Sequence, residues 1–121
     1  MRKYGVLLIV AVAAAAVLVA TASARRSATM LTGTDGPGFT IALKQGSKAV
    51  KTLKAGTYKF VIHDKSSIHG WSLDGPNGFA KDIAAVPATG TKTMTLKLKA
   101  GKYKFYCPAH EAEMFGHFTV K

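Results

Sequence analysis

Short runs of alternating apolar and polar residues, separated by turns rich in glycine and proline, make up most of this chain. In "TMTLKL", Met94, Leu96 and Leu98 fall on one face of an extended strand and the intervening residues on the other. Turn sequences such as "TDGPG", "DGPNG" and two copies of "KAG" recur between the runs. We therefore expect an all-β fold, a Greek-key sandwich or barrel of about seven to eight short strands. The expected strands are 39–44, 49–53, 57–64, 69–75, 82–86, 91–98, 102–107 and 115–121, and "GFAKDIAA" (78–85) is also compatible with one short helical turn.

The start of the chain has the three-part layout of a secretory signal peptide. Arg2 and Lys3 are followed by an apolar run over 5–20, and residues 22–24 end in the A-x-A pattern. We therefore predict that residues 1–24 are a signal peptide, with an uncleaved membrane anchor as the alternative. Either way, the rest of the protein is expected to be exported, to the periplasm, the medium or the cell surface.

The remaining length is enough for one domain with one core. We expect residues 25–34 to form an N-terminal tail or first strand and residues 35–121 to form the domain. Cys107 is the only cysteine, so an internal disulfide is excluded. A single thiol in an oxidising compartment persists best when it is occupied, which favours a ligand role for it.

The chain is strongly basic, with 17 Lys and Arg, 6 Asp and Glu, and a formal net charge of +11. Such a domain associates with acidic partners, anionic cell-wall polymers or lipid headgroups. The lysines are spread singly, with neither a basic helix nor a ladder of aromatic residues, so nucleic acid is not an expected partner. A membrane partner is expected if residues 1–24 are retained, and the protein is expected to be a monomer.

Two segments resemble each other, "LKAGTYKF" at 53–60 and "LKAGKYKF" at 98–105. In each, Lys-Ala-Gly turns the chain, and the tyrosine and phenylalanine at alternate positions point into the core. A tyrosine just after such a turn often bonds the nearby backbone through its hydroxyl group. Tyr58 and Tyr103 are therefore predicted to be structural.

The segment "YCPAHEAEM" gathers a thiol, an imidazole and a thioether, on Cys107, His110 and Met114. Copper favours thiolate and imidazole and binds thioether weakly, and two histidines, one cysteine and a distant methionine make the blue-copper electron-transfer site. A closed zinc site would need more or harder donors than these. The segment thus supplies three of the four ligands of a copper site.

The remaining donor must come from His63, His69 or His117. Alternation along 57–64 and 115–121 puts His63 and His117 on solvated faces. His69 lies at a loop-to-strand junction, which suits a side chain aimed into the end of a sandwich. We therefore prefer His69, with His117 and then His63 as substitutes.

With these residues in place, the chain resembles the plastocyanin-like cupredoxins, in particular small exported bacterial ones. The similar part is "SSIHGWSLDGP … TMTLKLKAGKYKFYCPAHEAEMFGHFTV", and the last twenty residues are the most alike. The resemblance implies one type 1 copper ion bound by His69, Cys107, His110 and Met114. It also implies a one-electron carrier that serves redox partner proteins, whose docking faces we expect to be acidic.

Two departures from the family pattern concern the strength of the site. One residue fewer separates His110 from Met114 than in plastocyanins, which affects axial ligation. Gly70 stands where relatives commonly carry an asparagine that ties the ligand loops together. Ser67, Ser72 or the backbone would have to replace that tie, and a looser site is expected.

The same ligands also suit an alternative function, copper buffering, delivery or resistance, and a further alternative is a metal-free interaction module. We do not expect an enzyme, because the Cys-His pair has no recognisable orienting partner. The acidic residues show no spacing that singles out an acid–base pair; they are Asp35, Asp64, Asp74, Asp82, Glu111 and Glu113. An apolar docking patch around His110 is expected from Pro37, Phe39, Pro76, Phe79, Pro108, Ala109 and Phe115, with Phe39 and Phe79 as alternative core residues.

Overall fold

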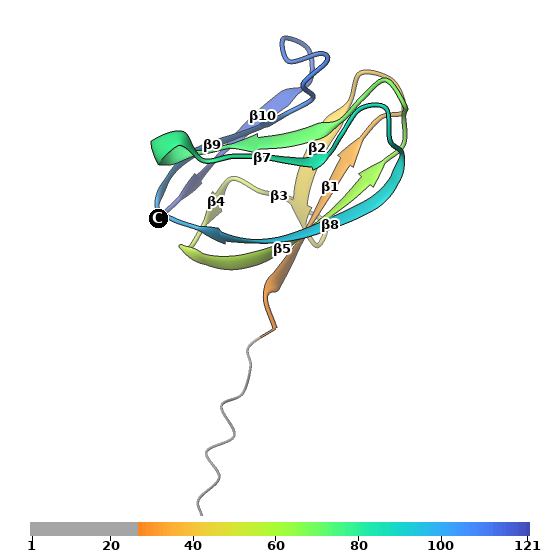
Figure 1. The fold of residues 1–121 in the computed structure, drawn as a ribbon. Helices are drawn as coiled ribbons and strands as arrows, with labels where there is room; N and C mark the ends of the chain where they lie inside the picture. Colours follow the sequence, from red (N-terminus) through yellow and green to blue (C-terminus); the bar gives the residue numbers. More distant parts are fainter. Residues whose placement is uncertain (1–26) are drawn as a thin grey trace, which may run out of the picture.

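The computed structural model describes residues 27–121, and the predicted signal peptide, 1–24, lies outside this part of the chain. It contains ten strands and one short 3-10 helix (Figure 1). In this part of the chain, no helix has the length and apolarity needed to cross a membrane. The elements are β1 (Thr29–Asp35), β2 (Ile41–Gln45), β3 (Lys48–Ala49), β4 (Thr52–Leu53), β5 (Gly56–Asp64), β6 (Trp71–Asp74), η1 (Pro76–Gly78), β7 (Ala80–Ala84), β8 (Gly90–Leu98), β9 (Gly101–Tyr106) and β10 (Phe115–Val120).

The strands form two five-stranded sheets, ordered β3-β2-β1-β5-β8 and β4-β10-β9-β6-β7. β1 runs parallel to β5, and β10 runs parallel to β4. The other pairs are antiparallel. Because the chain repeatedly passes from one sheet to the other, the expected all-β Greek-key sandwich is confirmed.

The segment expected as one strand at 49–53 in fact crosses between the sheets. Ala49 ends β3, which pairs with β2, whereas Thr52 begins β4, which pairs with β10. Val50 between them is buried, and its N–H donates to the carbonyl oxygen of Leu43 over 3.0 Å. The apolar residues of this segment therefore cover the edge of the core where the chain crosses from one sheet to the other.

The alternative of a helical turn in 78–85 is wrong. Most of that segment is β7, whose Ala84 pairs with Trp71 of β6. The short helix η1 comes just before it, where Asn77 adopts a left-handed conformation with φ of 57°. Burial of Ile83 and Ala84 against the sandwich outweighs the helical preference of an alanine-containing segment.

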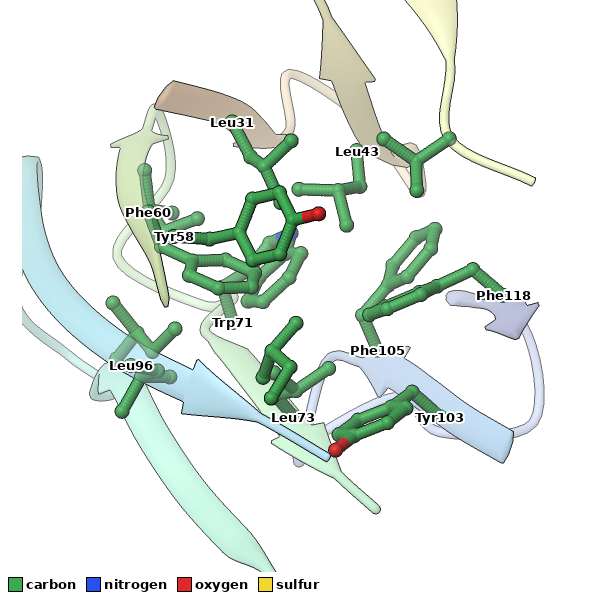
Figure 2. Packing of buried hydrophobic residues seen from close by; sticks show 14 of the residues in the cluster. Leu31, Leu43, Tyr58, Phe60, Trp71, Leu73, Leu96, Tyr103, Phe105 and Phe118 are labelled. Carbon is green, nitrogen blue, oxygen red and sulfur yellow. The ribbon is translucent and has the colours of Figure 1, made fainter. Parts of the chain in front are cut away.

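The core fills the space between the sheets around Trp71, as Figure 2 shows. The indole is fully buried and stacks on Phe105, with 5.3 Å between ring centroids. Its Nε1 donates to the carbonyl oxygen of Ala42 over 3.3 Å, so the buried N–H has a partner. Gly33 of β1 makes room for this ring, because a Cβ at that position would lie 3.1 Å from Trp71 Cε2.

The two similar segments play the same part in the two sheets. The hydroxyl of Tyr58 donates to the carbonyl oxygen of Lys54 over 2.7 Å, and that of Tyr103 to the carbonyl oxygen of Lys99 over 2.8 Å. Both rings are buried. The structural role predicted for the two tyrosines is confirmed, and the pair closes the same end of both sheets.

The sandwich thus has two distinct ends. We call one the loop end, where the segments 36–40, 65–70 and 107–114 connect the strands. At the opposite end, Gly56 pairs with Leu98 and Gly101 pairs with Val120. In Figure 1, β1 begins far from the loop that joins β9 to β10.

Candidate metal centre

The predicted donors come from two connections at the loop end. His69 lies in the turn between β5 and β6, held by a bond from its N–H to the carbonyl oxygen of Ser66 over 3.2 Å. Cys107 follows the last residue of β9, and Met114 precedes the first residue of β10. His110 lies on the connection between them.

Three donor atoms converge between these connections. The Nδ1 atoms of His69 and His110 are 3.0 Å apart. The sulfur of Cys107 is 3.8 Å from Nδ1 of His69 and 3.7 Å from Nδ1 of His110. Within residues 27–121, no other three His, Cys, Asp or Glu side chains are gathered in this way.

The size of this triangle fits a metal ion. Its centre lies about 2 Å from all three atoms, near the roughly 2.0–2.3 Å at which imidazole and thiolate bind a first-row metal. One thiolate and two imidazoles in a trigonal arrangement, with a weak thioether nearby, are the donors of type 1 copper. The donors present therefore fit one copper ion of this type.

The backbone holds the ligand loop in shape. The N–H of Cys107 donates to the carbonyl oxygen of Met114 over 3.0 Å, which closes the loop at its base. Inside it, the N–H of His110 donates to Cys107 and that of Met114 donates to His110, over 3.1 and 2.9 Å. Met114 is 1% exposed, so its thioether is a buried group at the base of the same loop.

The tie between the two connections runs through the backbone at Gly70. Its N–H donates to the sulfur of Cys107 over 3.4 Å. A Cβ at Gly70 would lie 2.6 Å from the carbonyl oxygen of Ala84, so an asparagine side chain has no room here. Ser72, one of the predicted substitutes, instead donates to Asp82 over 2.7 Å.

The donors are screened from solvent to different degrees. His69 and Cys107 are buried and His110 is half-buried, so an edge of His110 is the exposed part of the donor group. The ring of Phe39 lies edge-on to both imidazoles, with centroids 5.4 Å from His69 and 4.9 Å from His110. Phe39 itself is 59% exposed, which makes it a surface cover for the site.

The predicted docking patch needs a correction. Phe39 and Phe115 are exposed and belong to the loop end, as expected. Phe79 instead packs edge-on against Tyr103 at the opposite end, where Pro76 contacts the position of Gly101. Two exposed residues that were not expected, Ile68 and Val86, flank the site, because Ile68 precedes His69 and Val86 approaches Gly70.

The two substitute histidines lie apart from the donor group. His63 is half-buried, and its Nδ1 lies 3.1 Å from the hydroxyl of Thr91. His117 is exposed, and its ring contacts Phe115. Neither joins the cluster, so the structure brings together His69, Cys107 and His110.

A buried pair of carboxyl groups, Asp35 and Asp64, lies at the base of the loops and was missed by sequence reasoning. The two residues face each other at the ends of β1 and β5 and are 0% and 3% exposed. One oxygen of Asp64 accepts from the N–H of Ser66 over 3.1 Å, while the other three oxygens have no hydrogen-bond donor. Burial and the neighbouring negative charge of Asp64 raise the pKa of Asp35 to about 7.

Comparisons with known proteins agree with this geometry at the level of the fold. No protein-family model matches the sequence, and no curated protein matches it. Solved structures do match: the copper protein rusticyanin has a TM-score of 0.57 at 17% identity, over 78% of this chain and 80% of that one. Rusticyanin from Thiobacillus ferrooxidans, in another structure, has a TM-score of 0.51 at 20% identity over 78% and 79%.

Auracyanin A, a "blue" copper protein from the green thermophilic photosynthetic bacterium Chloroflexus aurantiacus, is also similar. The TM-score is 0.55 at 18% identity, over 78% of this chain and all of that one. These structures are cupredoxins, and this chain has the cupredoxin fold. The donor cluster described above lies at the loop end of this fold.

Proposed function

We propose that this protein is an exported type 1 copper protein that carries single electrons between redox partner proteins. The observation that carries the proposal is the triangle of His69, Cys107 and His110 at the loop end of a cupredoxin fold. Bound copper would supply the one-electron couple between Cu(I) and Cu(II). The likeness to rusticyanin and auracyanin supports the same conclusion.

Each donor has a distinct role in this proposal. Cys107 supplies the thiolate, and His69 and His110 supply the imidazoles, with Met114 as the weak axial ligand. His110 is in addition the exit for electrons, because its edge is the part of the donor group that a partner can approach. Met114 is assigned by its burial and its place at the base of the loop.

The protein matrix suits repeated electron transfer. A carrier works well when its ligands move little between oxidation states, and here both connections are fixed by backbone hydrogen bonds. The N–H of Gly70 at the sulfur and the cover provided by Phe39 leave little freedom around the donors. These features favour a carrier over a copper-delivery protein, which would need a more open site to release its ion.

Partner docking is proposed at the loop end. Phe39, Ile68, Val86 and Phe115 are 41–59% exposed, and we call these apolar residues of the loop end the apolar rim. Such a rim supports short-lived contacts with another protein. The net charge of +11 would attract acidic partner faces over longer distances, so the association rate should fall as salt rises.

Export is part of the proposal. Residues 1–24 would direct the chain out of the cytoplasm, to the periplasm or the cell surface, as a monomer. An uncleaved anchor would leave the same domain outside the membrane. Cleavage can be checked by N-terminal sequencing or intact mass of the protein recovered from its own cells.

The test is copper titration of residues 25–121, which retain all ten strands and the whole core. An intense thiolate-to-copper band in the visible spectrum, with matching electron paramagnetic resonance, is expected for the wild type and absent in Cys107→Ala. His117→Ala is the matched control and should keep the band. Weak d–d absorption alone would contradict the type 1 site, and rapid loss of Cu(I) to a chelator would favour copper delivery.

A further inference from the structure

The exposed lysines at the end opposite the metal centre form a basic surface that the proposed electron transfer does not use. β4 leads into the turn at Lys54, β8 ends beside Lys97 and Lys99, and the chain ends after β10. We call this surface the basic end; it comprises Lys51, Lys54, Lys97, Lys99, Lys102 and Lys121, all of them exposed.

Hydrogen bonds and strand register place these lysines together. The N–H of Ala55 donates to the carbonyl oxygen of Lys121 over 2.8 Å, and that of Thr119 donates to Lys51 over 3.0 Å. Lys102 pairs with Thr119, and the two tyrosine hydroxyl bonds end on Lys54 and Lys99. The side chains therefore project from neighbouring strand ends of both sheets.

No acidic residue offsets this charge locally. Of the six acidic residues, Asp35 and Asp64 are buried at the loop end. Glu111 and Glu113 lie on the ligand loop, and the remaining two, on β6 and β7, accept hydrogen bonds from Tyr106 and Ser72. Among residues 27–121, the one ion pair joins Lys104 to Glu111, so the basic end keeps its charge free.

The surface also offers hollows for anionic groups. Lys97 and Lys99 line a pocket of about 240 Å³ together with Tyr103 and Phe79. Lys51 and Lys102 line a second one, of about 440 Å³, on β10. Two lysines beside each hollow suit a phosphate group that enters from outside.

The path of the chain indicates which anionic partner lies on this side. β1 begins at the same end, since Thr29 pairs with Tyr58, two residues from the start of β5. Arg25 and Arg26 immediately precede the described residues, and the apolar run over 5–20 precedes them. If this apolar run inserts into a membrane, the short connection to β1 places the basic end next to that membrane.

We propose that the basic end docks on the surface of a bilayer that contains anionic phospholipids. In this orientation the loop end, with His110 and its apolar rim, points away from the membrane toward soluble partners. Lysines near an anionic membrane surface each strengthen binding, and the effect fades within about 8 Å at physiological salt. The inference does not depend on copper binding, so either proposal can fail without the other.

The test uses residues 25–121, without the apolar run, and large unilamellar vesicles of phosphatidylcholine with or without phosphatidylglycerol. Sedimentation should show binding to the anionic vesicles that weakens as salt is raised. The basic-end variant Lys54→Gln/Lys99→Gln/Lys102→Gln should lose roughly 100-fold in affinity, at roughly five-fold for each lysine. Circular dichroism checks that it is folded.

The matched control removes the same charge elsewhere, as Lys65→Gln/Lys81→Gln/Lys92→Gln, and should bind within a few-fold of the wild type. Acetylation read by mass spectrometry should show vesicles protecting Lys54, Lys99 and Lys102 and leaving the control lysines reactive. Equal losses in both variants, or no preference for anionic vesicles, would overturn the proposal. Binding by the basic end to a soluble polyanion but not to vesicles would also overturn it, in favour of a cell-wall polymer.

Discussion

Two buried polar clusters lie at the same end of this protein, and they differ in what can satisfy them. In the first, His69, Cys107 and His110 point three donor atoms at a common centre about 2 Å from each. In the second, Asp35 and Asp64 face each other with three oxygens that receive no hydrogen bond. The first cluster leaves room for a metal ion, whereas the second needs a proton.

The difference follows from the chemistry of the groups and their supports. The thiolate and imidazoles are soft donors, and backbone hydrogen bonds hold the two connections that carry them. Two ionised carboxylates cannot share a dry site without a large repulsion, so one of them keeps a proton into the neutral range. Buried polar groups thus provide metal donors in the first cluster. In the second, they lower the stability of the folded protein as pH rises.

The largest expected effect is that of copper on stability. Copper should raise the free energy of unfolding by about 4 kcal/mol when free copper exceeds Kd by about a thousand-fold. Cys107→Ser should abolish this rise, because two imidazoles alone bind copper weakly, while His117→Ala should keep it. Thermal unfolding with and without the ion measures both, and an equal rise in Cys107→Ser would remove the thiolate from the site.

The carboxyl pair should make the metal-free protein less stable as pH rises. The folded state holds the Asp35 proton up to about pH 7, while the unfolded chain releases it near the ordinary aspartate pKa of 3.8, so stability is lost between these limits. Asp35→Asn should raise the free energy of unfolding at about pH 8 by roughly 2–4 kcal/mol and flatten this decline.

Denaturant unfolding of the metal-free protein at about pH 5 and about pH 8 measures this effect. Glu113→Gln, an exposed carboxylate on the ligand loop, is the control and should retain the decline. If Asp35→Asn destabilised the protein equally at both values, the two carboxyl groups would not share a proton.

A smaller effect is expected from a substitution of Gly70, whose N–H donates to the sulfur of Cys107. Gly70→Ala would bring a methyl group within 2.6 Å of the carbonyl oxygen of Ala84 and push the N–H away from Cys107. We expect a loss of about 1–3 kcal/mol in stability together with a shifted thiolate-to-copper band. Ser67→Ala, an exposed change on the same connection, should alter neither, and a band unchanged in Gly70→Ala would show that this bond does not tune the site.

The smallest effect concerns the cover over the imidazoles. Phe39→Ala removes a ring that packs edge-on against His69 and His110, an interaction of about 0.5–1.5 kcal/mol. Copper release to a chelator should therefore become roughly 2- to 12-fold faster. Phe115→Ala, which removes a similarly exposed ring away from the donors, should leave the rate within two-fold of the wild type, at roughly 0.4 kcal/mol or less.

The sequence predicted the metal cluster far better than the carboxyl pair. Cys107, His110 and Met114 are close along the chain. The alternation of apolar and polar residues correctly predicted that the side chains of His63 and His117 point away from the metal centre. Asp35 and Asp64 lie on strands that pair in parallel, with three other strands of the chain between them. Their positions in the sequence therefore do not predict that the two carboxyl groups lie together.

β1 was the strand that was hardest to predict from the sequence, for a related reason. Leu31, Gly33 and Asp35 all face inward, so a glycine and a carboxyl group stand where apolar residues mark other strands. Gly33 is needed because Trp71 and Ile62 fill the space of its missing side chain. This requirement arises from tertiary packing and cannot be derived from alternation.

The bond from Gly70 to the sulfur has a consequence for how this protein can change over evolution. Because the donor is a main-chain N–H, exchanges of the surrounding side chains leave it in place as long as Gly70 itself, which has no room for a Cβ, is kept. Adjustment of the centre's electronic properties is therefore left to other groups, such as Phe39 beside the two imidazoles and the buried Met114. The sulfur should keep this hydrogen bond for as long as the beginning of β6 stays paired. The electronic properties of the centre and the pairing of that strand should therefore be retained or lost together during evolution.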